Sequence, residues 1–151
     1  SGTGKGYIGW RLRNNTTSNI SSITVTWTGE QWRRDNTVNQ SLVLSYQTGV
    51  TVTSLTTGAW TTTTSTFTSP QIVGGATALD GNVAANRSLN ISITINVTVG
   101  PGQEIMLRWE DLNDAGNDHQ LAIDDVTINA TLSPLPTNIA NNPGVNWVGS
   151  N

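Results

Sequence analysis

The sequence predicts an all-β protein in which two antiparallel sheets pack face to face. Thr, Asn and Ser supply 24, 17 and 13 of the 151 residues, and these residues favour strands or turns over helices. Hydrophobic residues make up 35% of the chain, and they alternate with polar ones. Because no amphipathic helix is available to cover the apolar faces, two sheets must cover each other. Jelly-roll and Greek-key connections both fit the spacing of the strands.

Successive runs show the period of two that is typical of half-buried strands. The clearest run covers residues 88–100, where six apolar residues alternate with Asn, Ser and Thr. Further runs cover residues 104–111 and 121–132, and a Pro101-Gly102 turn precedes the first of these. Three shorter stripes occupy earlier positions: Ile8, Trp10 and Leu12; Ile23, Val25 and Trp27; Leu42, Leu44 and Tyr46.

The remaining segments are predicted loops, apart from one Thr-rich stretch. Loops are expected at residues 14–18, 29–39, 69–85 and 113–119. Residues 59–70 include four consecutive Thr and fit a solvated strand or a loop. Trp10, Trp27 and Trp109 are expected to supply much of the core, since each aromatic side chain buries roughly 150–250 Å².

The chain divides into a β-sandwich domain over residues 1–132 and a tail over residues 133–151. The tail begins Ser-Pro-Leu-Pro and is polar except near Trp147, which favours a linker. Residues 145–148 could instead pair as an added strand on this domain or on a neighbouring one.

Charge and composition exclude several classes of function. One Lys and six Arg with a net charge of −3 provide no basic patch for nucleic acid or for an anionic membrane. No apolar run approaches the length of a membrane span. The absence of Cys excludes disulfides and thiolate chemistry. Low charge with abundant Thr and Asn favours an extracellular or cell-surface location.

Six of the ten acidic residues lie between Glu110 and Asp125. So many carboxylates repel one another unless a cation neutralises them, and Ca²⁺ takes six to eight oxygen ligands. The sequence therefore predicts a possible Ca²⁺ site, whose candidate ligands are Asp111, Asn113, Asp118, Asp124 and Asp125. The alternative is a solvated acidic turn with one Asp paired to an Arg.

Asp124 and Asp125 are adjacent within a predicted strand, so their side chains should point to opposite faces. One of them is then expected to be satisfied internally, by a metal or by an Arg such as Arg108. The alternation leaves open which of the two is buried, and a β-bulge at this pair could resolve the conflict.

A second dense segment, residues 27–35, combines Trp, Glu, Gln and Arg. Aromatic faces stack on sugar C–H groups, while carboxylate, amide and guanidinium groups bind hydroxyls. The candidate glycan ligands are Trp32, Glu30, Gln31, Arg33 and Trp60. In the alternative interpretation, Glu30 pairs with Arg33 or Arg108 and Trp32 caps the sandwich.

No catalytic arrangement stands out, so we expect no enzyme activity. Glu30 and Glu110 are candidate carboxylates for a glycosidase pair, but nothing in their spacing fixes a separation. The single His119 lies in an acidic segment that is expected to be exposed, and no Gly-x-Ser-x-Gly motif accompanies it.

Short blocks across residues 7–126 resemble a family of secreted bacterial jelly-roll modules, MAM-like or carbohydrate-binding-module-like, found beside extracellular nucleases, cadherin-like domains and lamin-tail domains. The blocks occupy residues 29–33, 54–60, 78–87, 107–116 and 118–126. The resemblance implies an extracellular jelly roll with a cation near its last strand. It also implies an opening strand before Gly2, whose absence would leave an unpaired edge beside residues 121–129. The tail near Trp147 or another chain could fill that edge.

The expected function is therefore a noncatalytic extracellular binding or adhesion module of a larger bacterial protein, with a glycan as ligand and with Ca²⁺ as a possible stabiliser. One alternative is a structural subunit of a filament or surface layer, assembled with neighbouring subunits by strand exchange. Another is an accessory domain of a secreted hydrolase.

Overall fold

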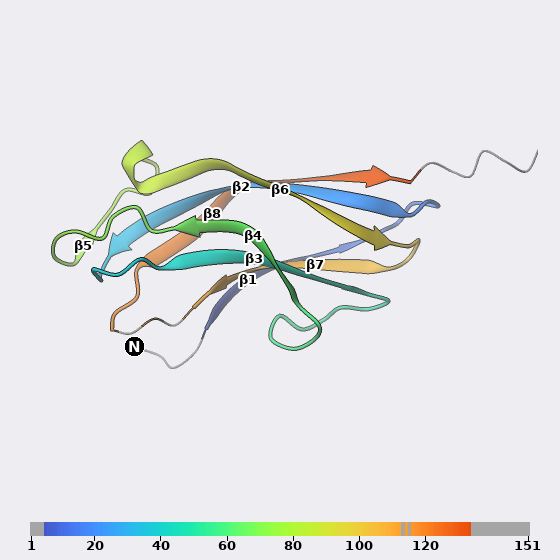
Figure 1. The fold of residues 1–151 in the computed structure, drawn as a ribbon, viewed down its shortest axis with the longest axis horizontal. Coiled ribbons are helices and arrows are strands. Elements are labelled where there is room, and N and C mark those ends of the chain that lie inside the picture. Colours follow the sequence, from blue (N-terminus) through green and yellow to red (C-terminus); the bar gives the residue numbers. More distant parts are fainter. Residues whose placement is uncertain (1–4, 113, 115, 134–151) are drawn as a thin grey trace, which may run out of the picture.

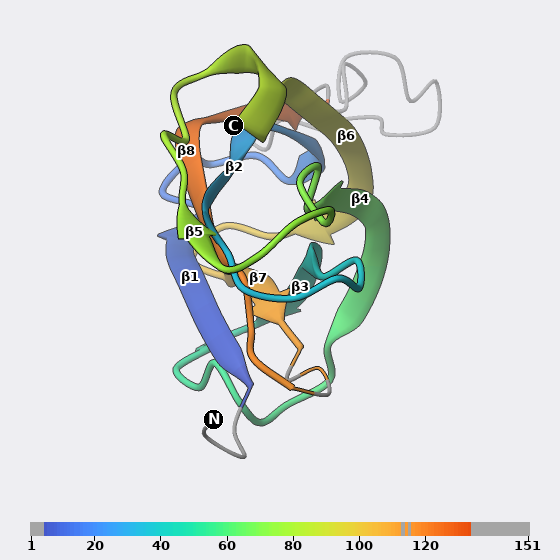
Figure 2. The same ribbon diagram turned by 90° about the vertical axis from the view of Figure 1, so that its left-hand side faces the viewer.

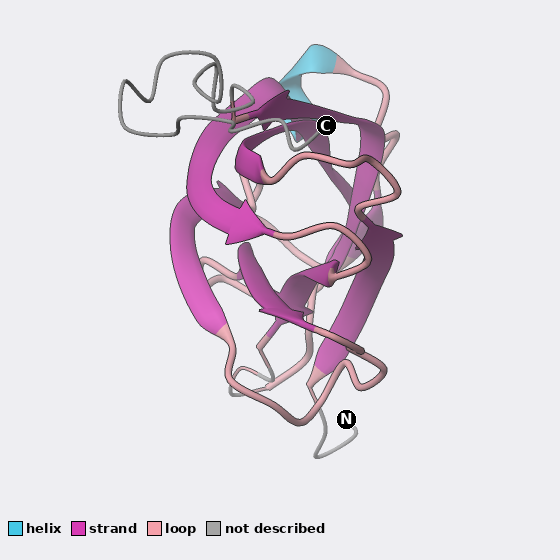
Figure 3. Ribbon diagram, turned by 90° about the vertical axis from the view of Figure 1, so that its right-hand side faces the viewer, coloured by secondary structure: helices cyan, strands magenta, loops and turns pink. Residues whose placement is uncertain are grey.

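The computed structural model describes residues 5–112, 114 and 116–133 and confirms the predicted antiparallel β-sandwich. Among these residues, strands dominate and the single turn of helix covers residues 84–86 (Figure 3). The strands are β1 (Gly6–Arg13), β2 (Ile20–Arg34), β3 (Ser41–Gly49), β4 (Thr61–Thr68), β5 (Thr77–Ala78), β6 (Arg87–Val99), β7 (Glu104–Asp111) and β8 (Gln120–Leu132).

The strands form two layers (Figure 1). The first sheet has the order β1-β7-β3-β4. In the second sheet β2 is central and pairs directly with β8, with β6 and, near its end at Arg33 and Arg34, with the short β5. Every pairing is antiparallel, and most connections cross between the sheets, as in a jelly roll. Seen end-on, β1 lies below β8 on one side and β4 below β6 on the other (Figure 2).

The core lies between the sheets and centres on two tryptophans. Trp27 and Trp109 are 0% and 1% exposed, and their rings meet edge to face at 5.8 Å. The Trp27 indole N–H donates to Ser65 Oγ at 3.0 Å. The core is completed by apolar side chains from both sheets: Ile20, Ile23, Val25, Leu42, Leu44, Phe67, Ile95, Val99, Ile105 and Leu107. The alternation of the sequence therefore identified the buried faces of most strands.

Two β-bulges flank β2, one opposite Thr28 and one opposite Trp27, and change which side chains point inward. In β6, Leu89 and Asn90 both lie opposite Thr28, and Asn90 has a φ of 56°. In β8, two residues lie opposite Trp27, and Asp125 has a φ of 51°. Asn and Asp tolerate this left-handed conformation better than most residues. The bulge in β6 leaves Leu89 53% exposed, which corrects the prediction that Leu89 faces the core.

The bulge in β8 also resolves the conflict at Asp124 and Asp125. Apolar side chains on both sides of the bulge pack against the core: Leu121, Ile123, Val126 and Ile128. Both carboxylates are exposed, so the prediction that one of them needs an internal partner is wrong. The extra residue shifts the inward face by one position, and neither Asp has to turn inward.

Two further predictions need correction. Residues 29–34 belong to β2 and not to a loop, because Gly29 is a site of close packing and not a turn. A Cβ at Gly29 would lie 2.2 Å from Phe67 Cγ. Trp10 is 47% exposed and is not a core residue, because no described strand covers β1 on that side.

Residues 50–60 fold over the outer face of the first sheet and bury polar side chains on that face. Val52 N donates to Glu104 at 2.8 Å, and Gln47 Nε2 donates to the Ser54 carbonyl at 3.0 Å. The Leu55 carbonyl accepts a hydrogen bond from Arg108 at 2.6 Å. The Thr-rich residues 61–68 that follow form β4. The predicted tail lies outside the described residues except for Ser133, whose N–H donates to the Asn19 carbonyl at 2.8 Å.

Candidate functional site

Trp32 and Glu30 form an aromatic–carboxylate pair on the outer face of the second sheet. Since Trp27 points into the core, alternation along β2 places Glu30 on the opposite face. The Trp32 indole N–H donates to Glu30 Oε2 at 2.8 Å. Glu30 is 4% exposed, whereas Trp32 is 39% exposed. The buried carboxylate therefore fixes the orientation of an indole that remains partly in water.

The loop before β6 holds this indole from the other side. Leu79 N donates to the Trp32 carbonyl at 2.8 Å, and a Cβ at Gly81 would lie 2.5 Å from the indole nitrogen. The loop itself is braced, because Asn86 Nδ2 donates to the Asp80 carbonyl at 2.9 Å. Trp32 is consequently a preorganised surface aromatic group and not a loosely attached one.

Arg87 adds a cation beside this pair. It lies directly opposite Glu30 in the β2–β6 ladder, and directly opposite residues on antiparallel strands share a face. Its Nε is buried and has no hydrogen-bond partner among the described residues. Composition alone did not single out Arg87, because its proximity to Glu30 depends on strand pairing between distant segments.

The outer face continues from Trp32 as a row of hydroxyl and carboxylate groups. Thr28 Oγ1 donates to Asp125 Oδ2 at 3.3 Å. Farther along β2, Thr26 and Thr24 each share a 2.9 Å hydrogen bond with a hydroxyl of β6. This face therefore offers a polar surface that ends at an aromatic ring.

The remaining predicted glycan ligands are not part of this arrangement. Gln31 is fully buried, and its amide exchanges hydrogen bonds with the backbone of Gln71 at 2.8 and 2.9 Å. Arg33 pairs with Asp35 at 3.0 Å. Trp60 stacks on Arg108 at 4.0 Å, on the outer face of the other sheet. The alternative pairing of Glu30 with Arg33 or Arg108 is also wrong, since Arg108 pairs with Glu110 at 2.9 Å.

The predicted Ca²⁺ ligands occupy two separate places. Asp111 ends β7 and lies near Asp114 and Asp118, whose charges act on it. Asp124 and Asp125 lie instead on the outer face of the second sheet, and Asn113 lies outside the described residues. Within the described part of the chain, no three acidic or His side chains are grouped closely enough to hold a metal ion.

Asp111 carries an electrostatic strain. Burial, followed by the charges of Asp118 and Asp114, raises its pKa to about 6. An unfolded Asp has a pKa of about 3.9, so the folded protein binds the extra proton between about pH 4 and pH 6, and the contribution of Asp111 to stability increases as the pH falls through that window.

Replacing Asp111 with Asn should therefore raise the melting temperature at pH 7, because the ionised carboxylate is then the unfavourable form. At pH 4 the Asp111 side chain is protonated in the folded state, so the variant and the parent should melt at nearly the same temperature. Thermal melting in EDTA at both pH values checks this expectation. A difference that is absent at pH 7, or that grows on acidification, would contradict it.

His119 is a structural residue of the loop before β8. It is 3% exposed, which corrects the prediction of an exposed loop position. Its Nδ1 accepts a hydrogen bond from Asp35 N at 3.0 Å, and its Nε2 lies 3.2 Å from the Val38 carbonyl. An accepting Nδ1 requires the proton on Nε2 in the neutral ring, so His119 ties the loop before β8 to the loop before β3.

Comparison with protein-family models gives no match, and comparisons with curated proteins and with solved structures give none either. Across the described residues, no helix is long and apolar enough to cross a membrane.

Proposed function

We propose that this protein is a noncatalytic binding module that holds a glycan on the outer face of the β2–β6–β8 sheet. The observation that carries the proposal is Trp32, an indole 39% exposed whose N–H is fixed by the buried Glu30. Such a ring can stack on sugar C–H groups without losing much conformational freedom.

The placement of the carboxylates supports binding over hydrolysis. A glycosidase needs two carboxyl groups on either side of one bond, separated by roughly 5 to 10 Å. Glu30 lies on the outer face of one sheet, whereas Glu110 lies on the outer face of the other, where it pairs with Arg108. The composition supports an extracellular location at a bacterial surface, where such a module would act in adhesion.

Replacing Trp32 with Ala should weaken polysaccharide binding about tenfold, which corresponds to about 1.4 kcal/mol. Affinity electrophoresis against a panel of bacterial and plant polysaccharides measures this effect. The control is Trp60→Ala, which removes an aromatic ring from the other sheet and should leave retention unchanged. Retention of no polysaccharide by the parent protein, or equal losses in both variants, would refute the proposed site.

We also propose that Ca²⁺ stabilises the loop after β7. Burial, followed by repulsion from Asp118 and Asp114, raises the pKa of Asp111. A hard cation bound to Asp111 and Asp118, with backbone and water oxygens completing the coordination, would stabilise the ionised carboxylate. Saturating Ca²⁺, at about 100 times its dissociation constant, should add roughly 2.7 kcal/mol to the free energy of unfolding. Melting in Ca²⁺ and in EDTA tests this, with Asp111→Asn as the variant that should lose the increment.

A second candidate function is that of a structural subunit assembled by strand exchange. The observation that favours it is an exposed apolar side chain where β1 and β8 form the edges of the two sheets. There an inward-facing tryptophan, Trp10, is 47% exposed, and a partner strand would cover it.

A further inference from the structure

Among the described residues, no strand closes the sandwich on the side where the β1 and β8 edges meet, which we call the open side. Among the described strands, β1 pairs only with β7, and β8 pairs only with β2. Both are therefore edge strands, and they lie on the same side of the molecule (Figure 2). β8 is 13 residues long, and a long unprotected edge readily accepts a further strand.

Apolar side chains on the open side point inward and yet remain in water. Ile8 and Trp10 lie opposite Trp109 and Leu107 in the β1–β7 ladder, so they share the inward face of those core residues. Trp109 and Leu107 are at most 1% exposed, whereas Ile8 and Trp10 are 43% and 47% exposed. The core thus lacks the cover that one additional strand beside β8 would provide.

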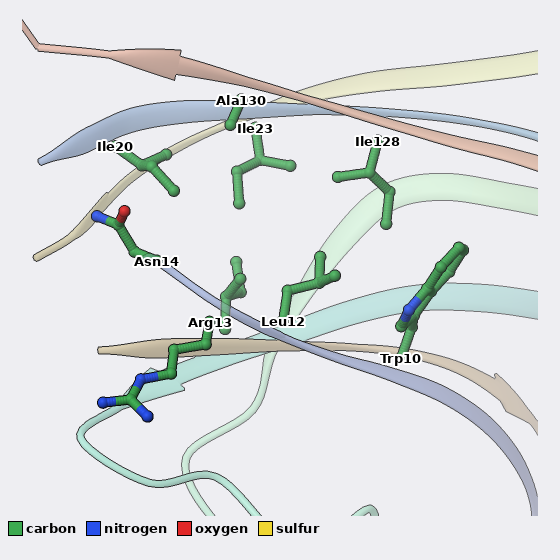
Figure 4. Close-up of a pocket in the computed structure, with 9 residues that line it drawn as sticks. Trp10, Leu12, Arg13, Asn14, Ile20, Ile23, Ile128 and Ala130 are labelled. Carbon is green, nitrogen blue, oxygen red and sulfur yellow. The ribbon is translucent and has the colours of Figure 1, made fainter. Parts of the chain in front are cut away.

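A groove of about 340 Å³ marks the place of that strand. Trp10 and Leu12 from β1 face Ile23 from β2 and Ile128 from β8 across it (Figure 4). Arg13 lies at one end of the groove (Figure 4). The shape and lining suit one extended segment whose alternate side chains are apolar.

The tail of the sequence contains such a segment. Residues 145–148 read Val-Asn-Trp-Val, so Val145 and Trp147 would share one face of a strand. We propose that residues 145–148 of one copy of this protein add as a strand to β8 of a second copy, with Val145 and Trp147 in the groove. This inference rests on the second proposed function and names the donor segment and the partner.

The end of β8 favours donation between copies over self-insertion. Beyond Leu132, Ser133 N still donates to the Asn19 carbonyl at 2.8 Å, so the chain leaves β8 in the direction of the strand. A later segment of the same chain must reverse direction or cross over before it can pair with β8. A segment from a second copy reaches the groove without that constraint.

Donation between copies gives a head-to-tail contact. Each copy carries one donor segment and one open side, so the contact does not close on itself and can repeat along a line. A filament or surface layer is the expected product, and its growth should depend on protein concentration.

The test is light scattering of the full chain over a wide concentration range, with three variants. The donor variant is V145N/W147N, which alters no described residue. The acceptor variant is Trp10→Ser, and the matched control is Trp32→Ser on the outer face. The parent and the control should increase in mass with concentration, whereas the donor and acceptor variants should stay monomeric.

An equimolar mixture of the donor and acceptor variants should form dimers and nothing larger, because the pair retains one intact segment and one intact open side. A monomeric parent at all concentrations would overturn both the donor assignment and the second proposed function. Oligomers that persist in the donor variant would overturn the donor assignment alone and would indicate edge-to-edge pairing of β8. Neither outcome bears on glycan binding at Trp32.

Discussion

Replacing Trp27 with Ala should lower the free energy of unfolding by about 3 to 5 kcal/mol. The side chain is completely buried and packs edge to face on Trp109 at 5.8 Å. The substitution also removes the hydrogen bond that the Trp27 indole N–H donates to the Ser65 hydroxyl. Urea denaturation followed by circular dichroism measures the loss.

The matched control is Trp10→Ala, measured at a concentration low enough to keep the protein monomeric. The same atoms are deleted, but Trp10 is already 47% exposed, so much less apolar surface returns to water on truncation. The expected loss is clearly smaller than that at Trp27. Equal losses would mean that Trp10 is covered in solution and that the open side is already filled.

The comparison between these two tryptophans shows what could be predicted from the sequence. Alternation identified the inward face of β1 as reliably as that of β2, because a strand's two faces follow from the period of two. Burial was predicted correctly for Trp27 and incorrectly for Trp10. Whether an inward-facing side chain is buried depends on the strand that packs opposite it, and local alternation does not predict whether such a strand is present.

The bulges mark a second limit. In β8 the apolar residues change parity at Asp124 and Asp125, and the sequence left two assignments of the buried face open. One extra residue with a positive φ at Asp125 makes both halves of the strand inward-facing. This switch of the apolar residues from odd to even positions indicates an irregularity in the strand. The position of the bulge, however, depends on the pairing of β8 with β2.

The candidate site was predicted only in part for a similar reason. Trp32 and Glu30 are two residues apart on one strand, so their common face follows from local geometry. Arg87 lies beside them only because of the register between β2 and β6. Trp60 is not near them, because its loop packs on the outer face of the other sheet. Residue types that suit a ligand can be chosen from composition, whereas their assembly into one site requires the sheet topology.

Replacing Arg108 with Ala should lower the free energy of unfolding by about 3 kcal/mol, the lower end of the range for breaking a buried ion pair, because Lys5 still pairs with Glu110. Arg108 is 7% exposed, and its guanidinium lies between the rings of Tyr7 and Trp60, at 4.7 and 4.0 Å. It also donates to Glu110 at 2.9 Å and to the Leu55 carbonyl at 2.6 Å. One side chain therefore joins β1, β7 and the loop over residues 50–60.

A specific second readout distinguishes this role from general destabilisation. Because the loop over residues 50–60 is anchored partly through Arg108, the variant should be cleaved there by a protease under conditions in which the parent resists. Arg108→Lys should fall between the two, since an ammonium group keeps the charge but cannot reproduce the planar stacking and the two-directional hydrogen bonding of Arg. Arg33→Ala is the control, because the Arg33 side chain is 41% exposed and exposed ion pairs contribute about 0 to 1 kcal/mol. Equal losses at Arg33 and Arg108 would show that the stacked guanidinium does not anchor the loop.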